Sequence, residues 1–163
     1  MGKMLKIYTI ENDKEEKILR QKSLDIPTEK FKNKEFREFL DDLLYTAIHS
    51  EEQGNVPAGG ISAPQVGVNK NIFYILNYDT NKWELFINPS VEPTGFIKMT
   101  TEEGCLSVPN ILGNVNRYKN IKVKFQDLDG NWITKKYSDL NAITIQHEKD
   151  HLEGILFIDR MDK

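Results

Sequence analysis

The chain has 163 residues with a net charge of −3, and it contains a single cysteine, Cys105. That length allows one domain with a real hydrophobic core, and a lone cysteine excludes an internal disulfide. No cluster of basic residues indicates a nucleic-acid-binding surface, and no apolar run is long enough to cross a bilayer. The N-terminus has no signal-peptide apolar region, so we expect one cytoplasmic domain at residues 1–163.

The first predicted element is an amphipathic helix from Thr28 to about Ser50, which Thr28 or Asn33 can cap. A polar loop at residues 51–60 ends this helix and leads into the glycine-rich stretch GGISAPQVG, residues 59–67. No Lys-Ser or Lys-Thr follows, so a phosphate-binding loop is not expected. Apolar residues recur along the helix at three- and four-residue spacing: Phe36, Phe39, Leu40, Leu43, Leu44, Ala47 and Ile48.

The pattern then changes to short strands rich in β-branched and aromatic residues. Pro89 is expected to end the second of these strands, and Asp129-Gly130 is a strong hairpin signal inside the last. The strand-like runs are residues 71–76, 85–89, 121–125 and 127–137.

A second helix follows, with Asp139 or Asn141 as its cap and Gly154 at its C-terminal end. The order of elements predicts an α+β fold in which antiparallel β-sheets pack around this C-terminal helix, together with an N-terminal helix. We expect both helices to lie on one side of the sheet.

The second helix carries the sequence HEKDH at residues 147–151. His147 and His151 are four residues apart and therefore share one helix face, a geometry that can bind one divalent metal. Glu148 flanks this pair without needing to bind the metal, which is where a general base belongs. A solvated, charged helix face is the alternative. Apolar neighbours on the same helix favour burial, and a buried histidine pair needs a partner.

A catalytic site of this kind requires a third protein ligand. Asp159 and Asp162 are carboxylates, but they lie beyond the expected end of the helix. Cys105, within EEGCLS at residues 102–107, is the better candidate.

With GGISAPQ, EGCLS and QHEKDH in this order, the chain resembles the peptide deformylase family over essentially its whole length. The resemblance implies a metallohydrolase that removes the N-formyl group from the initiator methionine of new polypeptides. We further expect a cytoplasmic monomer that acts near the ribosome exit, without a nucleic-acid-binding motif or a membrane partner.

The resemblance also implies a metal site and a mechanism. One divalent metal, Fe²⁺ in the cell with Zn²⁺, Ni²⁺ or Co²⁺ as possible replacements, would be held by three ligands. A metal-bound water would attack the formyl carbon while Glu148 transfers the proton. Gln65 and the backbone N–H of Leu106 would stabilise the oxyanion. The ligands implied are Cys105, His147 and His151.

Substrate contacts carry over from the same motifs. The methionine pocket is expected beside Ile143 and Thr144, and the peptide backbone beside the glycine-rich loop. The full set of expected substrate-binding residues is Gly60, Ile61, Gly104, Ile143 and Thr144.

Four further residues near the motifs carry expectations. Asp150 is expected to pair with Arg117. Ala58 stands where the family more often has glycine, and the preceding loop is long, which affects substrate reach. Lys149 stands where the family is more often apolar, and we expect it to face solvent.

Two other functions fit parts of the same pattern. A generic HExxH metallopeptidase would not need Cys105. A non-catalytic, metal-stabilised module that binds N-terminal methionine would need a fourth protein ligand, and the sequence offers no obvious one.

Overall fold

The structure is a computed structural model that describes residues 2–54 and 57–162. Its helices are α1 (Asp13–Leu19), α2 (Lys34–Ile48) and α3 (Asp139–Leu152), with 3₁₀ turns η1 (Thr28–Lys30), η2 (Ser50–Gln53), η3 (Ala63–Val66) and η4 (Phe157–Asp159). Its strands are β1 (Gly60–Ser62), β2 (Ile72–Asn77), β3 (Lys82–Pro93), β4 (Lys98–Cys105), β5 (Val108–Tyr118), β6 (Asn120–Gln126) and β7 (Trp132–Ser138).

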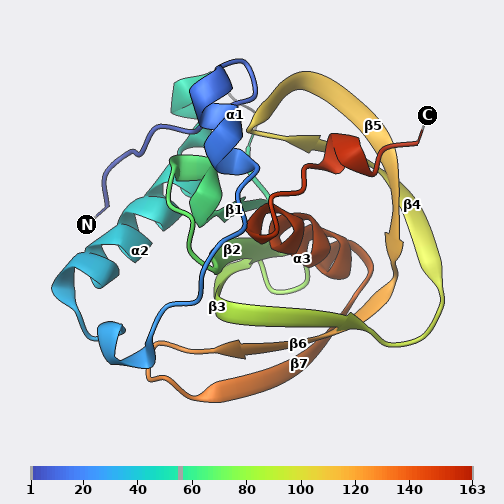
Figure 1. Cartoon of the computed structure of the whole chain (residues 1–163). Coiled ribbons are helices and arrows are strands. Elements are labelled where there is room, and N and C mark those ends of the chain that lie inside the picture. Colours follow the sequence, from blue (N-terminus) through green and yellow to red (C-terminus); the bar gives the residue numbers. More distant parts are fainter. Residues whose placement is uncertain (1, 55–56, 163) are drawn as a thin grey trace.

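The strands form two separate antiparallel sheets (Figure 1). The larger sheet has the strand order β1-β2-β3-β6-β7, and the smaller is the β4–β5 ribbon. Helix α3 lies between the ribbon and the larger sheet. The predicted α+β fold, with antiparallel sheets around the C-terminal helix, is therefore confirmed.

The two long helices cover opposite faces of the larger sheet, so the prediction that they share one side is wrong. Ile72 and Tyr74 of β2 pack in the cluster that includes α2. Phe73 and Ile75, which alternate with them, pack in the cluster that includes α3. Successive side chains of a strand point to opposite faces. The continuous apolar run of β2 therefore required cover on both faces.

The first long helix starts later than predicted, at Lys34 instead of Thr28. The side chain of Asn33 accepts hydrogen bonds from the backbone of Glu35 and Phe36, so the predicted Asn33 cap is confirmed. Residues 28–30 form a separate 3₁₀ turn that follows Pro27.

The last helix begins at Asp139, but neither predicted cap is used as a cap. Ser138 occupies the cap position and makes no side-chain capping bond. Asn141 instead accepts a hydrogen bond from Tyr78 N–H at 2.8 Å and so ties the helix to the turn after β2. The predicted C-terminal glycine is confirmed, because Gly154 has a φ of 76°.

Pro89 does not end a strand, contrary to the prediction, because β3 continues to Pro93. A bulge between Ile87 and Ser90 interrupts the pairing of β3 with β6. Asn88 within it has a φ of 51°. Proline has no N–H to donate, so it is tolerated where a bulge breaks the ladder. The predicted hairpin turn is confirmed, because Gly130 lies between β6 and β7 with a φ of 85°.

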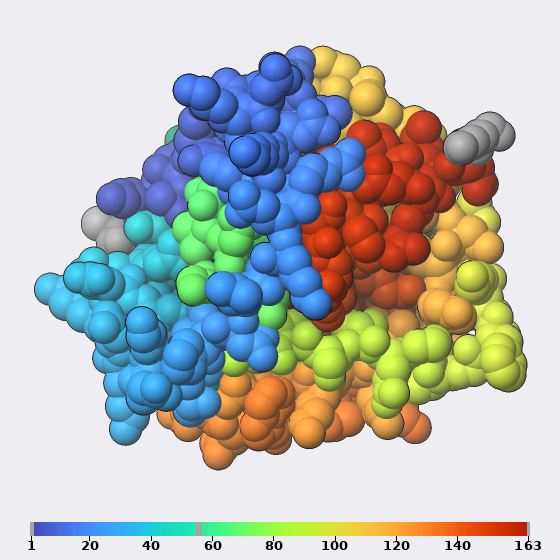
Figure 2. Space-filling view, viewed as in Figure 1, coloured from blue at the N-terminus to red at the C-terminus, as the bar shows by residue number. Residues whose placement is uncertain are grey.

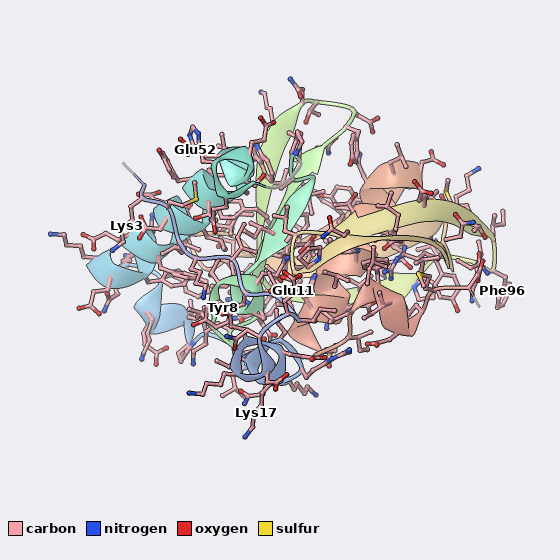
Figure 3. The ribbon with its side chains drawn as sticks, turned by 90° about the horizontal axis from the view of Figure 1, so that it is seen from above. Lys3, Tyr8, Glu11, Lys17, Glu52 and Phe96 are labelled. Atoms are coloured by element: carbon pink, nitrogen blue, oxygen red, sulfur yellow. The ribbon has the colours of Figure 1, made fainter. Side chains whose placement is uncertain are left out.

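The early and late parts of the chain lie side by side on one face (Figure 2). Ser23 N–H donates to the Leu152 carbonyl at 2.8 Å, which anchors the segment after α1 to the end of α3. At the other extreme, Phe96 stands at the tip of the turn between β3 and β4, where it is 97% exposed (Figure 3). No helix among the described residues is both long and apolar enough to cross a membrane.

Candidate metal centre and active site

The three predicted metal ligands converge, although two come from α3 and one from the end of β4. The ligand atoms of Cys105, His147 and His151 all lie within 4.8 Å of one another. Cys105 Sγ is 3.3 Å from His151 Nε2. One helix turn brings the two imidazoles to a centroid separation of 5.1 Å. The geometry groups one sulfur and two nitrogen donors around a common point.

Glu103 holds the first histidine in place, and sequence reasoning did not assign it a role. Its Oε1 lies 2.8 Å from His147 Nδ1. Arg117 donates to both oxygens of Glu103, at 2.6 Å from Nε and 3.0 Å from Nη2. Because Nδ1 is engaged, the Nε2 of His147 is left for a metal, which is the usual arrangement for metal-bound histidine. The sequence signal was present, since Glu103 precedes Cys105 by two residues on the same strand.

The electrostatics of the two histidines suit a cation. Burial lowers the pKa of His151 well below its ordinary 6.5 and keeps its imidazole neutral, the form that binds metals. Burial also opposes a proton on His147, but hydrogen bonds with Cys105 and Glu103 outweigh it and raise that pKa. The anionic groups that favour a proton there would equally favour a metal cation.

The residues present fit a divalent metal. Thiolate and imidazole donors are the set that iron and zinc accept. His151 Nδ1 and Glu148 Oε1 are buried without a hydrogen-bond partner among the described residues. A buried polar atom without a hydrogen-bond partner is costly in a protein interior. These two atoms therefore indicate a site that is arranged to bind another group.

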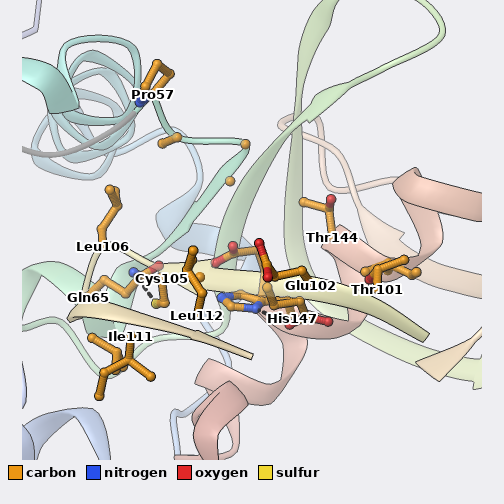
Figure 4. Close-up of a pocket in the computed structure, with 18 of the residues that line it drawn as sticks. Pro57, Gln65, Thr101, Glu102, Cys105, Leu106, Ile111, Leu112, Thr144 and His147 are labelled. Carbon is orange, nitrogen blue, oxygen red and sulfur yellow. Dashed lines mark hydrogen bonds and ion pairs between the residues drawn. The ribbon is translucent and has the colours of Figure 1, made fainter. Parts of the chain in front are cut away.

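Gln65 is held in one orientation beside the ligands, and it is only 1% exposed. Its Oε1 accepts from the backbone N–H of Ser62 at 3.0 Å and from the Ser62 hydroxyl at 3.2 Å. Its Nε2 is thereby directed at Cys105 Sγ, 3.5 Å away (Figure 4). The same Nε2 lies 3.2 Å from Ser107 Oγ. Gln65 is therefore not a solvated loop residue, and its amide N–H₂ group lies beside the predicted metal ligand Cys105.

Glu148 lines a cavity beside these groups and is 3% exposed. Burial raises its pKa to about 7, against the opposing positive charges of His147 and Arg117 and with a smaller contribution from Glu103. A carboxyl group with a pKa close to neutrality can both accept and release a proton at physiological pH.

The cavity above these groups has a volume of about 500 Å³. Leu106, at the turn between β4 and β5, lines it together with four residues predicted to bind substrate: Gly60, Gly104, Ile143 and Thr144. The side chain of Ile61 is fully buried in the core on the α2 side, so a substrate role for Ile61 stays a prediction.

The predictions for neighbouring residues have mixed outcomes. The predicted pair of Asp150 and Arg117 is confirmed, with Nη1 2.9 Å from Oδ2, and Arg160 adds a second cation to Asp150 at 2.6 Å. Lys149 pairs with Glu153 at the surface end of the helix, and its side chain is about one-fifth exposed. Ala58 lines the cavity, whereas residues 55 and 56 of the same loop lie outside the described residues.

Comparison with known proteins points to one family. The sequence model of the family Polypeptide deformylase matches residues 4–163. The peptide deformylase of Zymomonas mobilis subsp. mobilis is 39% identical over 150 residues, which cover 86% of this chain and 85% of that protein. The crystal structure of peptide deformylase from Thermotoga maritima superimposes with a TM-score of 0.85 at 29% identity, over 99% of this chain and 100% of that chain. The Met-Ala-Ser-bound crystal structure of class I type b peptide deformylase from Acinetobacter baumannii gives a TM-score of 0.85 at 27% identity, over 99% and 100% of the two chains.

Proposed function

We infer that this chain, which belongs to the polypeptide deformylase family, removes the formyl group from the N-terminal methionine of newly synthesised polypeptides. It is a metallohydrolase with peptide deformylase activity. One observation gives the main support for this function. The three proposed metal ligands, Cys105, His147 and His151, converge beside a cavity that the Glu148 carboxylate and the Gln65 amide also line.

A divalent metal held by Cys105, His147 and His151 would supply Lewis acidity and lower the pKa of a water molecule. We propose Fe²⁺ as the physiological ion. Zn²⁺, Ni²⁺ and Co²⁺ would fit the same sulfur and imidazole donors.

Glu148 moves the proton in this reaction. Its carboxylate accepts a proton from the attacking water and later delivers it to the departing amine nitrogen. A carbon–oxygen bond forms at the formyl carbon and the carbon–nitrogen bond breaks. The products are formate and a peptide with a free methionyl amine.

Gln65 and Leu106 act on the charge that develops on the formyl oxygen. The Nε2 group of Gln65 donates one hydrogen bond, and the backbone N–H of Leu106 donates a second. Because Ser62 fixes the amide orientation, the first donor requires no reorganisation during the reaction. Preorganised donors of this kind lower the barrier by about 3–4 kcal/mol each.

The substrate is proposed to be an extended peptide. The Acinetobacter baumannii structure contains Met-Ala-Ser, and the cavity of about 500 Å³ in this chain has a volume in the usual range for ligand pockets. Ile143 and Thr144, together with Leu106, would surround the methionine side chain. The backbones of Gly60 and Gly104 would lie beside the peptide backbone, as in strand addition.

The proton transfer is tested with Glu148→Gln, assayed as formate release from formyl-Met-Ala-Ser. We expect roughly a thousandfold loss of kcat with metal content unchanged, because the amide cannot accept the proton. Glu153→Gln is the matched control, since Glu153 lies just past the same helix and pairs with surface lysines. Full activity of Glu148→Gln would remove the proposed proton path.

The ligand set is tested with Cys105→Ser. A neutral serine hydroxyl is a poorer ligand than a thiolate, so metal content and formate release should fall together. A Cys105→Ser protein that keeps one metal per chain and full activity would favour a generic HExxH peptidase. Metal binding without formate release in the unmodified protein would favour a methionine-binding module.

A further inference from the structure

Gly60 in β1 faces Glu148 in α3 at very short range. A Cβ atom placed on Gly60 would lie 2.7 Å from Oε2, 3.0 Å from Cγ and 3.1 Å from Cδ of Glu148. Optimal contacts between non-bonded carbon atoms are roughly 3.5–4.0 Å. Three consecutive atoms of the glutamate side chain are therefore too close, not only its tip. Any side chain at position 60 would occupy the space that the Glu148 carboxylate now fills.

The backbone does not itself require glycine at this position. Gly60 is not among the described residues with positive φ, and it pairs in regular antiparallel register with Ile75 of β2. An L-residue could adopt this extended conformation without strain. The contact with Glu148 is thus the feature of position 60 that excludes a side chain.

Glu148 has little room to yield. It is 3% exposed and follows His147, whose ring is fixed by Glu103 on one side and stacks on Phe157 at a centroid distance of 6.1 Å. A methyl group at position 60 would therefore push the carboxylate along the cavity wall. A displacement of about 1 Å at a catalytic group can cost about a hundredfold in rate.

We propose that Gly60 is a positioning residue for Glu148: its missing side chain leaves the space that holds the carboxylate beside the metal ligands. This inference rests on the proposed proton transfer by Glu148. It differs from the expectation that Gly60 only lets the substrate backbone approach, because the two roles affect different kinetic constants. Poor placement of Glu148 lowers kcat, whereas a blocked approach raises KM.

Gly60→Ala tests the proposal by comparison with the unmodified protein. The measurements are kcat and KM for formyl-Met-Ala-Ser, Kd for the product Met-Ala-Ser, and metal content. We expect Gly60→Ala to lose at least tenfold in kcat, with KM, Kd and metal content within twofold. An unchanged kcat, or a tenfold rise in KM and Kd at normal kcat, would overturn the proposal.

Truncating the glutamate provides a second test. Glu148→Ala removes Cγ, Cδ and Oε2, the three atoms that a Cβ on Gly60 would meet, so Gly60→Ala should destabilise the Glu148→Ala protein less than it destabilises the unmodified protein. We expect the two substitutions to be non-additive in the midpoint of urea unfolding in this double-mutant cycle, and simple additivity would overturn the proposal. If Gly60→Ala alone does not fold, recovery of folded protein in the double variant supports the overlap, and no recovery refutes it.

Failure of this inference can be distinguished from failure of the proposed function. Full activity of Glu148→Gln would defeat the proton transfer itself. An inactive Glu148→Gln protein, together with a Gly60→Ala protein that behaves like the unmodified protein, would defeat only the positioning role.

Discussion

Replacing Arg117 with methionine should destabilise the protein strongly, because Arg117 is the cation at the centre of a buried ionic network. It donates two hydrogen bonds to Glu103 and one to Asp150, and its side chain is 3% exposed. Asp150 would keep Arg160 as a partner. Glu103 would keep only the ring of His147. The loss of stability therefore arises mainly from Glu103.

The magnitude follows from two independent routes. Burial alone would raise the pKa of Glu103, but hydrogen bonds from His147 and Arg117 outweigh it and lower the pKa from 4.5 to about 2. A downward shift of that size corresponds to about 3 kcal/mol, to which His147 and Arg117 both contribute. Removing one partner of a buried ion pair typically costs about 3–5 kcal/mol. We expect a loss of about 4 kcal/mol in the free energy of unfolding, or roughly 8–16 °C in Tm for a chain of this size.

The pKa of Glu103 determines how the stability loss of Arg117→Met changes with pH. Because the folded-state pKa of Glu103 is depressed, its stabilising contribution is present above its ordinary pKa of 4.5 and is lost as pH falls toward 2. Without Arg117 its hydrogen bonds and charge no longer lower the pKa of Glu103, while burial still raises it, so the pKa rises from its depressed value and the carboxyl becomes protonated at higher pH. The deficit of Arg117→Met relative to the unmodified protein should therefore shrink as pH falls from 7 to 4.

Urea unfolding of the metal-depleted proteins measures this deficit without a contribution from metal binding. The matched control is Lys122→Met, which removes a cation from the exposed pair with Glu92 and should cost less than about 1 kcal/mol. The reasoning is wrong if Arg117→Met costs no more than Lys122→Met at pH 7. It is also wrong if its deficit stays constant down to pH 4.

Two further predictions concern the oxyanion donor and the core. Gln65→Ala should lower kcat about 10²–10³-fold with metal content unchanged; a variant within fivefold of the unmodified enzyme would remove Gln65 from that role. Leu43→Ala, at a fully buried position of α2, should cost about 2–5 kcal/mol by urea unfolding. Ile48→Ala at the half-exposed end of the same helix should cost less than about 1 kcal/mol, and equal costs would contradict the packing described.

The β4–β5 ribbon and helix α1 show why some elements were not predicted from the sequence. Strands β4 and β5 pair almost only with each other, and residues 98–105 alternate little between apolar and polar side chains. Strands of this kind are defined by non-local pairing and carry a weak local pattern. Helix α1 has only seven residues, which is too short a segment for hydrophobic periodicity to identify a helix.

Pro89 and Thr28 show the opposite error. At each residue a strong local sequence signal predicted the boundary of an element, and the structure places that boundary elsewhere. Proline usually ends a strand, but the bulge at Asn88 lets β3 continue past it. Thr28 is a good cap by composition, yet the helix begins only after the Asn33 cap. Local propensities decide such boundaries weakly, and tertiary contacts decide them in the end.

The sequence by itself determined the chemical inventory of the site: Cys105, the two histidines of HEKDH, Glu148 and Gln65. Those residues lie in short motifs whose spacing along a helix or loop is set by local geometry. Only the tertiary structure decided which atoms meet. It placed Glu103 and Arg117 behind His147, directed the Gln65 amide toward Cys105, and set Gly60 against Glu148. Each of these contacts joins segments far apart in the chain, and its distance depends on how β1, the β4–β5 ribbon and α3 pack together.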